Sequence, residues 1–305
     1  MEYRTLGKTG LKVSVISYEA SSLGSEFRQI DEAEGIRSLL MAIDLGVNFI
    51  DVSPYYGRTK AESVLGKGLA SVPRHKYYLA TKVGRYDIAS FDFSAARVIR
   101  SVDESLSRLG VDHIDLIQCH DIEFGALEQV VNETIPALRK VQEQEKVRFV
   151  GITGLPLKIF RYVLERAEVD TILSYCRYSL NDTALEDLIP YLQAKGVGII
   201  NASPLSMRLL TESGPPSWHP ASDAIKAACA KAAAYCRSKG VDIAQLAMQF
   251  ATSNPNIHTT LVGTANPEHI KRNIAWIQQP IDRELLAEVQ EILAPIHHQT
   301  WQSGR

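Results

Sequence analysis

The sequence predicts an α/β fold, a (β/α)8 TIM barrel with an N-terminal β-hairpin, from three observations. Short apolar runs alternate with longer amphipathic stretches along the chain, and there are eight such runs, the strand number of this barrel. The length of 305 residues suits one such barrel. The G-x-G-x-x-G motif that a doubly wound dinucleotide-binding sheet usually carries is missing. Because no Gly-, Ser- or Pro-rich linker divides the chain, we expect a single barrel domain over residues 1–305.

The strand predictions depend on short runs that are apolar on both faces, as in buried parallel strands. Before them, YRTLGKTGLKVS predicts a small hairpin with its turn at Gly7–Gly10. The predicted strands are residues 13–20, 47–52, 77–83, 114–119, 147–152, 171–176, 197–202 and 258–263.

Helices are predicted in the amphipathic stretches that separate and follow these runs. Residues 31–46 are the clearest case, because Asp31 is a good N-cap, Gly46 a good stop, and the apolar residues between them form one stripe. The other predicted helices are residues 60–70, 94–109, 126–145, 156–167, 183–196, 222–239, 266–277 and 282–293.

Composition excludes several classes of function. There are 33 Lys and Arg against 35 Asp and Glu, a formal charge of −2, so a nucleic-acid-binding role is not expected. No apolar run is long enough to span a membrane, and the first ten residues are polar, so we expect no membrane association, no signal peptide and a cytoplasmic location. The four cysteines form no C-x-x-C pair, and His297–His298 have no partner ligands at usable spacing, so no metal site is expected.

Polar side chains follow three consecutive predicted strands, where a barrel of this kind places its catalytic groups. Asp51 ends the second run and Tyr56 follows it, Lys82 closes the third, and His120 follows the fourth. A buried lysine needs a carboxylate, and Asp51 on the neighbouring strand can supply one. An adjacent ammonium would lower the pKa of Tyr56, so that its hydroxyl could exchange a proton near neutral pH, while His120 could orient a substrate oxygen. Such a site suits proton transfer coupled to hydride transfer at a carbonyl or alcohol carbon.

The motifs DVSPYYG and ATK, with the histidine after the fourth run, resemble those of the aldo-keto reductases. The resemblance covers almost the whole chain and implies that Asp51, Tyr56, Lys82 and His120 form the catalytic tetrad of that family. Longer stretches, among them SPYYGRTKAESVLGKGL, CHDIEFG and GPPSWHPAS, are similar to the plant-type L-galactose dehydrogenases.

This resemblance also implies a nicotinamide dinucleotide bound across the barrel mouth. At the carboxamide positions of the family the sequence has Thr153, Gly154 and Tyr175, and Ala202 stands where an aromatic residue usually stacks on the nicotinamide. The implied pyrophosphate loop contains Ser203, Pro204, Leu205, Met207 and Leu209.

The adenosine end favours NAD over NADP. On the NADP-binding pattern K-S-x-x-x-x-R-x-x-x-N of the family, this sequence has Gly263, Thr264, His269 and Asn273, so both cations are missing. A phosphate dianion would lose two charge-assisted partners, although Arg272 lies nearby in the sequence.

The implied reaction is NAD-dependent oxidation of the anomeric hydroxyl of a sugar, L-galactose to L-galactono-1,4-lactone, with Tyr56 as the acid/base. Candidate substrate contacts are Tyr55, His120, Asp121 and Glu123. Tyr18–Glu19 replace glycines usual at the end of the first strand, which leaves a related sugar 1-dehydrogenase acting on L-fucose or D-arabinose as an alternative. Further alternatives are an NADP-dependent carbonyl reductase and, in a different class, a non-catalytic cofactor-binding barrel subunit.

Overall fold

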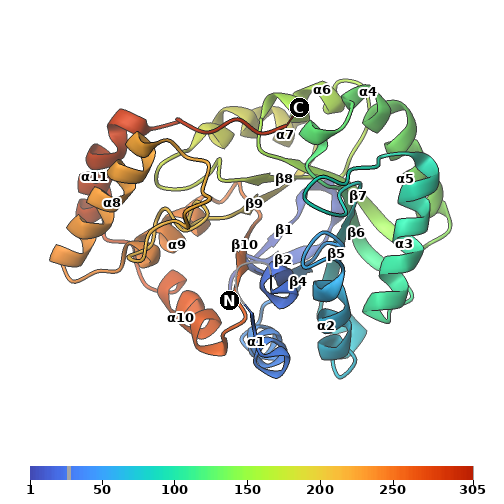
Figure 1. Ribbon diagram of the computed structural model, residues 1–305, viewed down its shortest axis with the longest axis horizontal. Helices are drawn as coiled ribbons and strands as arrows, with labels where there is room; N and C mark the ends of the chain where they lie inside the picture. The colour runs from blue at the N-terminus through green and yellow to red at the C-terminus, as the bar shows by residue number, and fades with distance from the viewer. Residues whose placement is uncertain (26–28, 305) are drawn as a thin grey trace.

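Eight parallel strands close into a barrel in this computed structural model, which describes residues 1–25 and 29–304. The strand order around the barrel is β10-β3-β4-β5-β6-β7-β8-β9, as expected for a TIM barrel (Figure 1). The strands are β3 (Ile16–Glu19), β4 (Phe49–Asp51), β5 (Tyr78–Val83), β6 (Ile114–Cys119), β7 (Val147–Gly154), β8 (Thr171–Tyr175), β9 (Gly198–Ala202) and β10 (Thr259–Gly263). The predicted fold class is confirmed.

The N-terminal hairpin consists of β1 (Tyr3–Thr5) and β2 (Lys12–Ser14), which pair antiparallel. It closes the amino-terminal end of the barrel, since Lys8 N donates to Gly196 O at 2.7 Å and Leu6 is fully buried in the barrel interior. The predicted strand 13–20 therefore divides: its first residues belong to the hairpin, and the barrel strand begins at Ile16.

Helices surround the barrel in the expected alternation. They are α1 (Glu32–Asp44), α2 (Lys60–Leu69), α3 (Ala95–Leu109), α4 (Leu127–Gln129), α5 (Ile135–Glu143), α6 (Lys158–Leu164), α7 (Ile189–Ala194), α8 (Asp223–Ser238), α9 (Ile243–Ser253), α10 (Pro267–Ile277) and α11 (Arg283–Leu293). Asp31 caps α1 as predicted, accepting a bond from Glu34 N at 2.9 Å. The predicted helix 126–145 is interrupted by a π-turn over residues 130–134.

Helix α9 has no counterpart among the predicted helices. Nine of its eleven residues are buried, so its apolar positions form no single stripe that would reveal a surface helix. It packs against α8 and α10.

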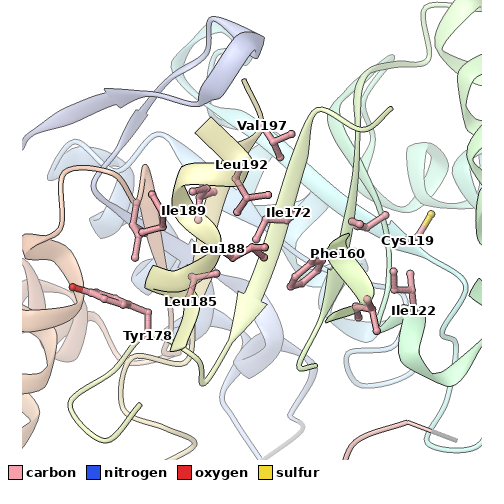
Figure 2. Close-up of a cluster of buried hydrophobic side chains, with 14 of the residues drawn as sticks. Cys119, Ile122, Phe160, Ile172, Tyr178, Leu185, Leu188, Ile189, Leu192 and Val197 are labelled. Carbon is pink, nitrogen blue, oxygen red and sulfur yellow. The ribbon is translucent and has the colours of Figure 1, made fainter. Parts of the chain in front are cut away.

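The core has an inner and an outer part. Inside the barrel, inward-facing residues such as Phe49, Leu116 and Ile200 fill the space between the strands. Outside it, strands and helices bury larger clusters, and Figure 2 shows Phe160, Ile172 and Leu192 within one of them. This packing makes the barrel a rigid support for side chains at its carboxyl end. Within the described ranges, no helix has the length and apolar character needed to cross a membrane.

Candidate active site

Three side chains, those of Asp51, Lys82 and Tyr56, meet at the carboxyl ends of β4 and β5. Asp51 is fully buried and Lys82 is 2% exposed. The Lys82 ammonium donates to Asp51 Oδ1, to Val52 O at 3.0 Å and to the Tyr56 hydroxyl at 3.2 Å. Burial raises the pKa of the Asp51 carboxyl, and the Lys82 ammonium opposes that shift. The structure thus brings Asp51, Lys82 and Tyr56 together as predicted from the strand ends.

Gln118 is a further member of this cluster that sequence reasoning missed. Its Nε2 donates to Asp51 Oδ2 at 2.7 Å, so both carboxylate oxygens of Asp51 are held. The signal was a polar residue within the apolar run IDLIQC, two residues after inward-facing Leu116.

The tyrosine pKa differs from the expectation. Burial, followed by the charges of Glu19, Asp51 and Asp121, raises the pKa of Tyr56 well above its ordinary value. The expected lowering of this pKa was therefore wrong, because burial of the hydroxyl and the surrounding carboxylates outweigh the lowering by the nearby cation Arg85. Tyr56 is a neutral phenol at neutral pH and becomes a base only at alkaline pH.

His120 stands beside the tyrosine and is neutral. Burial lowers its pKa to about 3, and the nearby cations Lys82 and Arg85 add to that effect. Its ring lies 5.8 Å from that of Tyr56, centroid to centroid, at an angle of 87°. Its Nδ1 is 3.0 Å from the hydroxyl of buried Ser53. A neutral imidazole in this place can hold a substrate oxygen without competing for the proton of Tyr56.

Asp121 follows His120 in a left-handed backbone conformation (φ 50°). Its carboxylate accepts from Arg85 Nη1 and, at 3.2 Å, from the Thr153 hydroxyl. Burial alone would raise the pKa of Asp121, but this pKa is lowered, and Arg85 is the cation responsible because His120 is neutral. Arg85 also stacks on Tyr55, with its guanidinium carbon 3.9 Å from the ring centroid. No pattern in the sequence singled out Arg85, which lies in an irregular loop after β5.

Glu123 is joined to the C-terminal segment. Its Oε1 accepts from Leu155 N at 3.0 Å and from the Ser303 hydroxyl at 2.9 Å, and the Tyr175 hydroxyl lies 3.4 Å away. Burial and the Asp121 carboxylate raise the pKa of Glu123 to about 7. The residues after α11 run across the molecule toward α6 and α7 (Figure 1). Residues far apart in the sequence therefore meet at one rim of the barrel.

The loop after β9 contains the residues expected around a pyrophosphate. Ser203, Ser206, Met207 and Arg208 all have positive φ, between 49° and 77°. Such left-handed turns can turn backbone N–H groups toward an anion. Leu209 is 1% exposed and packs into the outer hydrophobic cluster, so its side chain anchors the loop to the core.

At the expected adenosine end, Gly263 is exposed, whereas Thr264 and Asn273 are buried. The Thr264 carbonyl accepts from the Tyr18 hydroxyl at 2.8 Å, so Tyr18 points out of the barrel and anchors this segment. His269 is exposed on α10, and the guanidinium carbon of Arg272 lies 4.7 Å from the Trp276 ring centroid.

Comparisons with known proteins agree with this fold. Residues 16–294 match the aldo/keto reductase family. The sequence is 52% identical to an L-galactose dehydrogenase from Arabidopsis thaliana, over 100% of this chain and 98% of the relative. It is 33% identical to a D-arabinose 1-dehydrogenase from Saccharomyces cerevisiae, over 70% and 67% of the two chains. A solved aldo-keto reductase from Bacillus halodurans, in its holo form, superposes with a TM-score of 0.81 at 25% identity, over 100% and 99%.

This chain belongs to the aldo/keto reductase family. As a member of this family it is an oxidoreductase that uses a nicotinamide cofactor, and it is homologous to L-galactose dehydrogenase.

The residues of this aldo/keto reductase fit such a cofactor at the carboxyl end of the barrel. The left-handed backbone at Ser203 and at residues 206–208 is of the kind that can direct N–H groups toward an anion. An added Cβ at Gly263 would lie 2.8 Å from Glu19 Oε2, so the end of β10 has little space for a side chain. Thr153 already binds Asp121, and the Tyr175 hydroxyl contacts Glu123, so two of the three expected carboxamide residues are engaged within the protein. Metal binding finds no support among the residues that the structure describes, which contain no group of three His, Cys, Asp or Glu suited to an ion.

Proposed function

We propose that the chain oxidises the anomeric hydroxyl of an aldose, L-galactose before others, to L-galactono-1,4-lactone, with NAD as the hydride acceptor. The observation that carries the proposal is the 52% identity to an L-galactose dehydrogenase over the full length of this chain. The contacts of Asp51, Tyr56 and Lys82, with His120 beside them, support it. Oxidation of the five-membered ring form at C1 gives the 1,4-lactone, since the ring oxygen stays bonded to C1.

In this proposal, side chains of the protein accept the proton of the C1 hydroxyl and orient the groups around it. In its deprotonated form, Tyr56 takes the proton of the C1 hydroxyl. Lys82 stabilises this tyrosinate by donating a hydrogen bond to its oxygen. Asp51 and Gln118 hold Lys82 in place through the Asp51 carboxylate. His120 is proposed to bind the reacting oxygen, and Asp121 and Glu123 to accept bonds from other sugar hydroxyls. The bound nicotinamide supplies the acceptor for the hydride that leaves C1.

The raised pKa of Tyr56 sets the direction of the pH dependence. The base form accumulates only as the pH rises toward that pKa, so the rate of oxidation should increase through the alkaline range. In the reverse direction Tyr56 must give up a proton, so reduction should not need alkaline conditions.

Two features support NAD over NADP. Positions 263 and 269, which are cationic in NADP-binding members, are glycine and histidine in this chain, and Arg272 lies against the ring of Trp276. A 2′-phosphate would therefore lack the charge-assisted partners that an NADP site supplies.

The test is a steady-state assay of NADH formation with L-galactose, L-fucose, L-gulose, D-arabinose and D-galactose, repeated with NADP. We expect the highest kcat/KM with L-galactose and NAD. A higher value with D-arabinose or L-fucose would favour the related sugar 1-dehydrogenase, for which the 33% identical D-arabinose 1-dehydrogenase is the supporting observation. Absence of NADH formation with every sugar would contradict the proposal.

A further inference from the structure

The hydroxyl of Ser53 lies next to His120 and contacts one hydrogen-bond acceptor among the described residues. It is fully buried in the loop between β4 and α2, and its Oγ accepts from Tyr55 N at 3.1 Å. The other contact of this hydroxyl is His120 Nδ1, at 3.0 Å. A hydroxyl has one proton to donate, and within the described ranges no acceptor other than Nδ1 contacts Ser53.

The two nitrogens of His120 are therefore unequal. A neutral imidazole carries one proton, and a nitrogen that accepts from Ser53 cannot carry it. The proton then belongs to Nε2, on the opposite side of the ring, which faces Asp121 Oδ2 at 3.7 Å. That distance is too long for a hydrogen bond, and the carboxylate is already held by Arg85 and Thr153.

We propose that Ser53 is a positioning residue that sets the tautomer of His120, so that Nε2–H points into the site as a neutral donor. This inference rests on the proposed sugar oxidation, since the donor would hold the C1 oxygen while Tyr56 takes its proton. A ring protonated at Nδ1 would instead present a lone pair to that oxygen, which repels it. Ser53 acts through His120 and need not touch the substrate.

The first measurement is independent of turnover. A long-range ¹H–¹⁵N spectrum of the full chain labelled with ¹⁵N-histidine reports which nitrogen is protonated, and the His120→Gln spectrum assigns the His120 signals. We expect Nε2 protonated and Nδ1 shifted as an acceptor in the unchanged protein. In Ser53→Ala the Nδ1 signal should move toward that of an unbonded nitrogen. A proton on Nδ1 in the unchanged protein, or an Nδ1 signal unaffected by Ser53→Ala, would overturn the proposal.

The second measurement is kinetic. Loss of one buried hydrogen bond predicts about a 10-fold lower kcat/KM for the sugar in Ser53→Ala, with the Kd for NAD unchanged. Ser53→Thr keeps the hydroxyl and should restore both the spectrum and the rate. Ser17→Ala is the matched control, because it also removes a fully buried serine hydroxyl but lies at the amino-terminal half of the barrel, in contact with Thr259.

The two proposals fail in different ways. If the spectra behave as expected but no sugar is oxidised, the sugar-oxidising function is wrong while the role of Ser53 in the tautomer stands. If sugars are oxidised and Ser53→Ala has the spectrum and kcat/KM of the unchanged protein, the role of Ser53 is wrong.

Discussion

Two parts of the barrel mouth are built by different means. At the ends of β4, β5 and β6, side chains hold one another: Lys82 binds Asp51 and Tyr56, and Gln118 binds Asp51. At the end of β9, the backbone provides the shape, through left-handed residues between 203 and 208. We infer that the first part, here termed the catalytic side, tolerates little change, whereas the second, the cofactor side, can be altered while the fold is kept.

Tyr56→Phe tests the catalytic side with the largest expected effect. In the proposed reaction the phenol takes the C1 proton, so turnover should fall by about 10³-fold or more. The aromatic ring is kept, so NAD binding should change little. Steady-state rates and a fluorescence titration with NADH measure the two quantities, and substantial residual turnover would contradict the assignment.

The substitution Lys82→Met tests whether the ion pair on the catalytic side also stabilises the fold. The substitution keeps an apolar side chain of similar length but leaves the carboxylate of Asp51 buried without its cation. Breaking such a pair costs about 3–5 kcal/mol, which should lower the free energy of unfolding in urea by that order. Asp51→Asn combined with Lys82→Met removes the orphaned charge and should recover much of the stability, although not the activity. Equal stability of the single and double variants would argue against an ionic interaction there.

On the cofactor side, His269→Arg with Gly263→Lys should shift the preference toward NADP. Two new cations offer charge-assisted partners to a 2′-phosphate, so the ratio of kcat/KM for NADP to that for NAD should rise by about 10-fold or more. His269→Arg alone is the cleaner first step, because a side chain at Gly263 must displace the Glu19 carboxylate. His269→Gln, which adds no charge, is the control. A ratio unchanged by both cations would mean that the adenosine end lies elsewhere.

The sequence predicted that the residues of the catalytic side lie close together, for a physical reason. Parallel strands end at one rim, so polar residues after apolar runs identified Asp51, Lys82 and His120 and correctly implied their proximity. Gln118 was missed although its position in the strand alternation marks it as inward-facing.

Other features depend on contacts between distant residues, which periodicity does not reveal. Arg85 became visible only through its contacts with Tyr55 and Asp121, and the bond of Ser303 to Glu123 joins residues 180 positions apart. The pKa of Tyr56 was predicted in the wrong direction, because burial raises it together with three carboxylates, Glu19, Asp51 and Asp121, that come from three different segments. The barrel, by contrast, could be predicted, because each strand is marked by an apolar run within its own short stretch of sequence.

Glu123→Gln is expected to have the smallest effect, and it probes the rim between the two parts. The pKa of Glu123 is raised to about 7 in the folded protein, above its ordinary value of about 4.3 in an unfolded chain. Its contribution to stability is therefore fully present below about pH 4 and is lost as the pH rises through about 7. Glutamine keeps an oxygen for Leu155 N and the Ser303 hydroxyl but cannot ionise.

The Glu123→Gln variant should consequently be more stable than the unchanged protein at pH 8, by roughly 1–3 kcal/mol, with the advantage shrinking toward pH 5. Thermal unfolding across this pH range measures the difference, with Glu128→Gln, which alters an exposed carboxylate on α4, as the control. A constant difference at every pH would mean that the Glu123 carboxyl does not titrate in this range and that Ser303 is held independently of its charge.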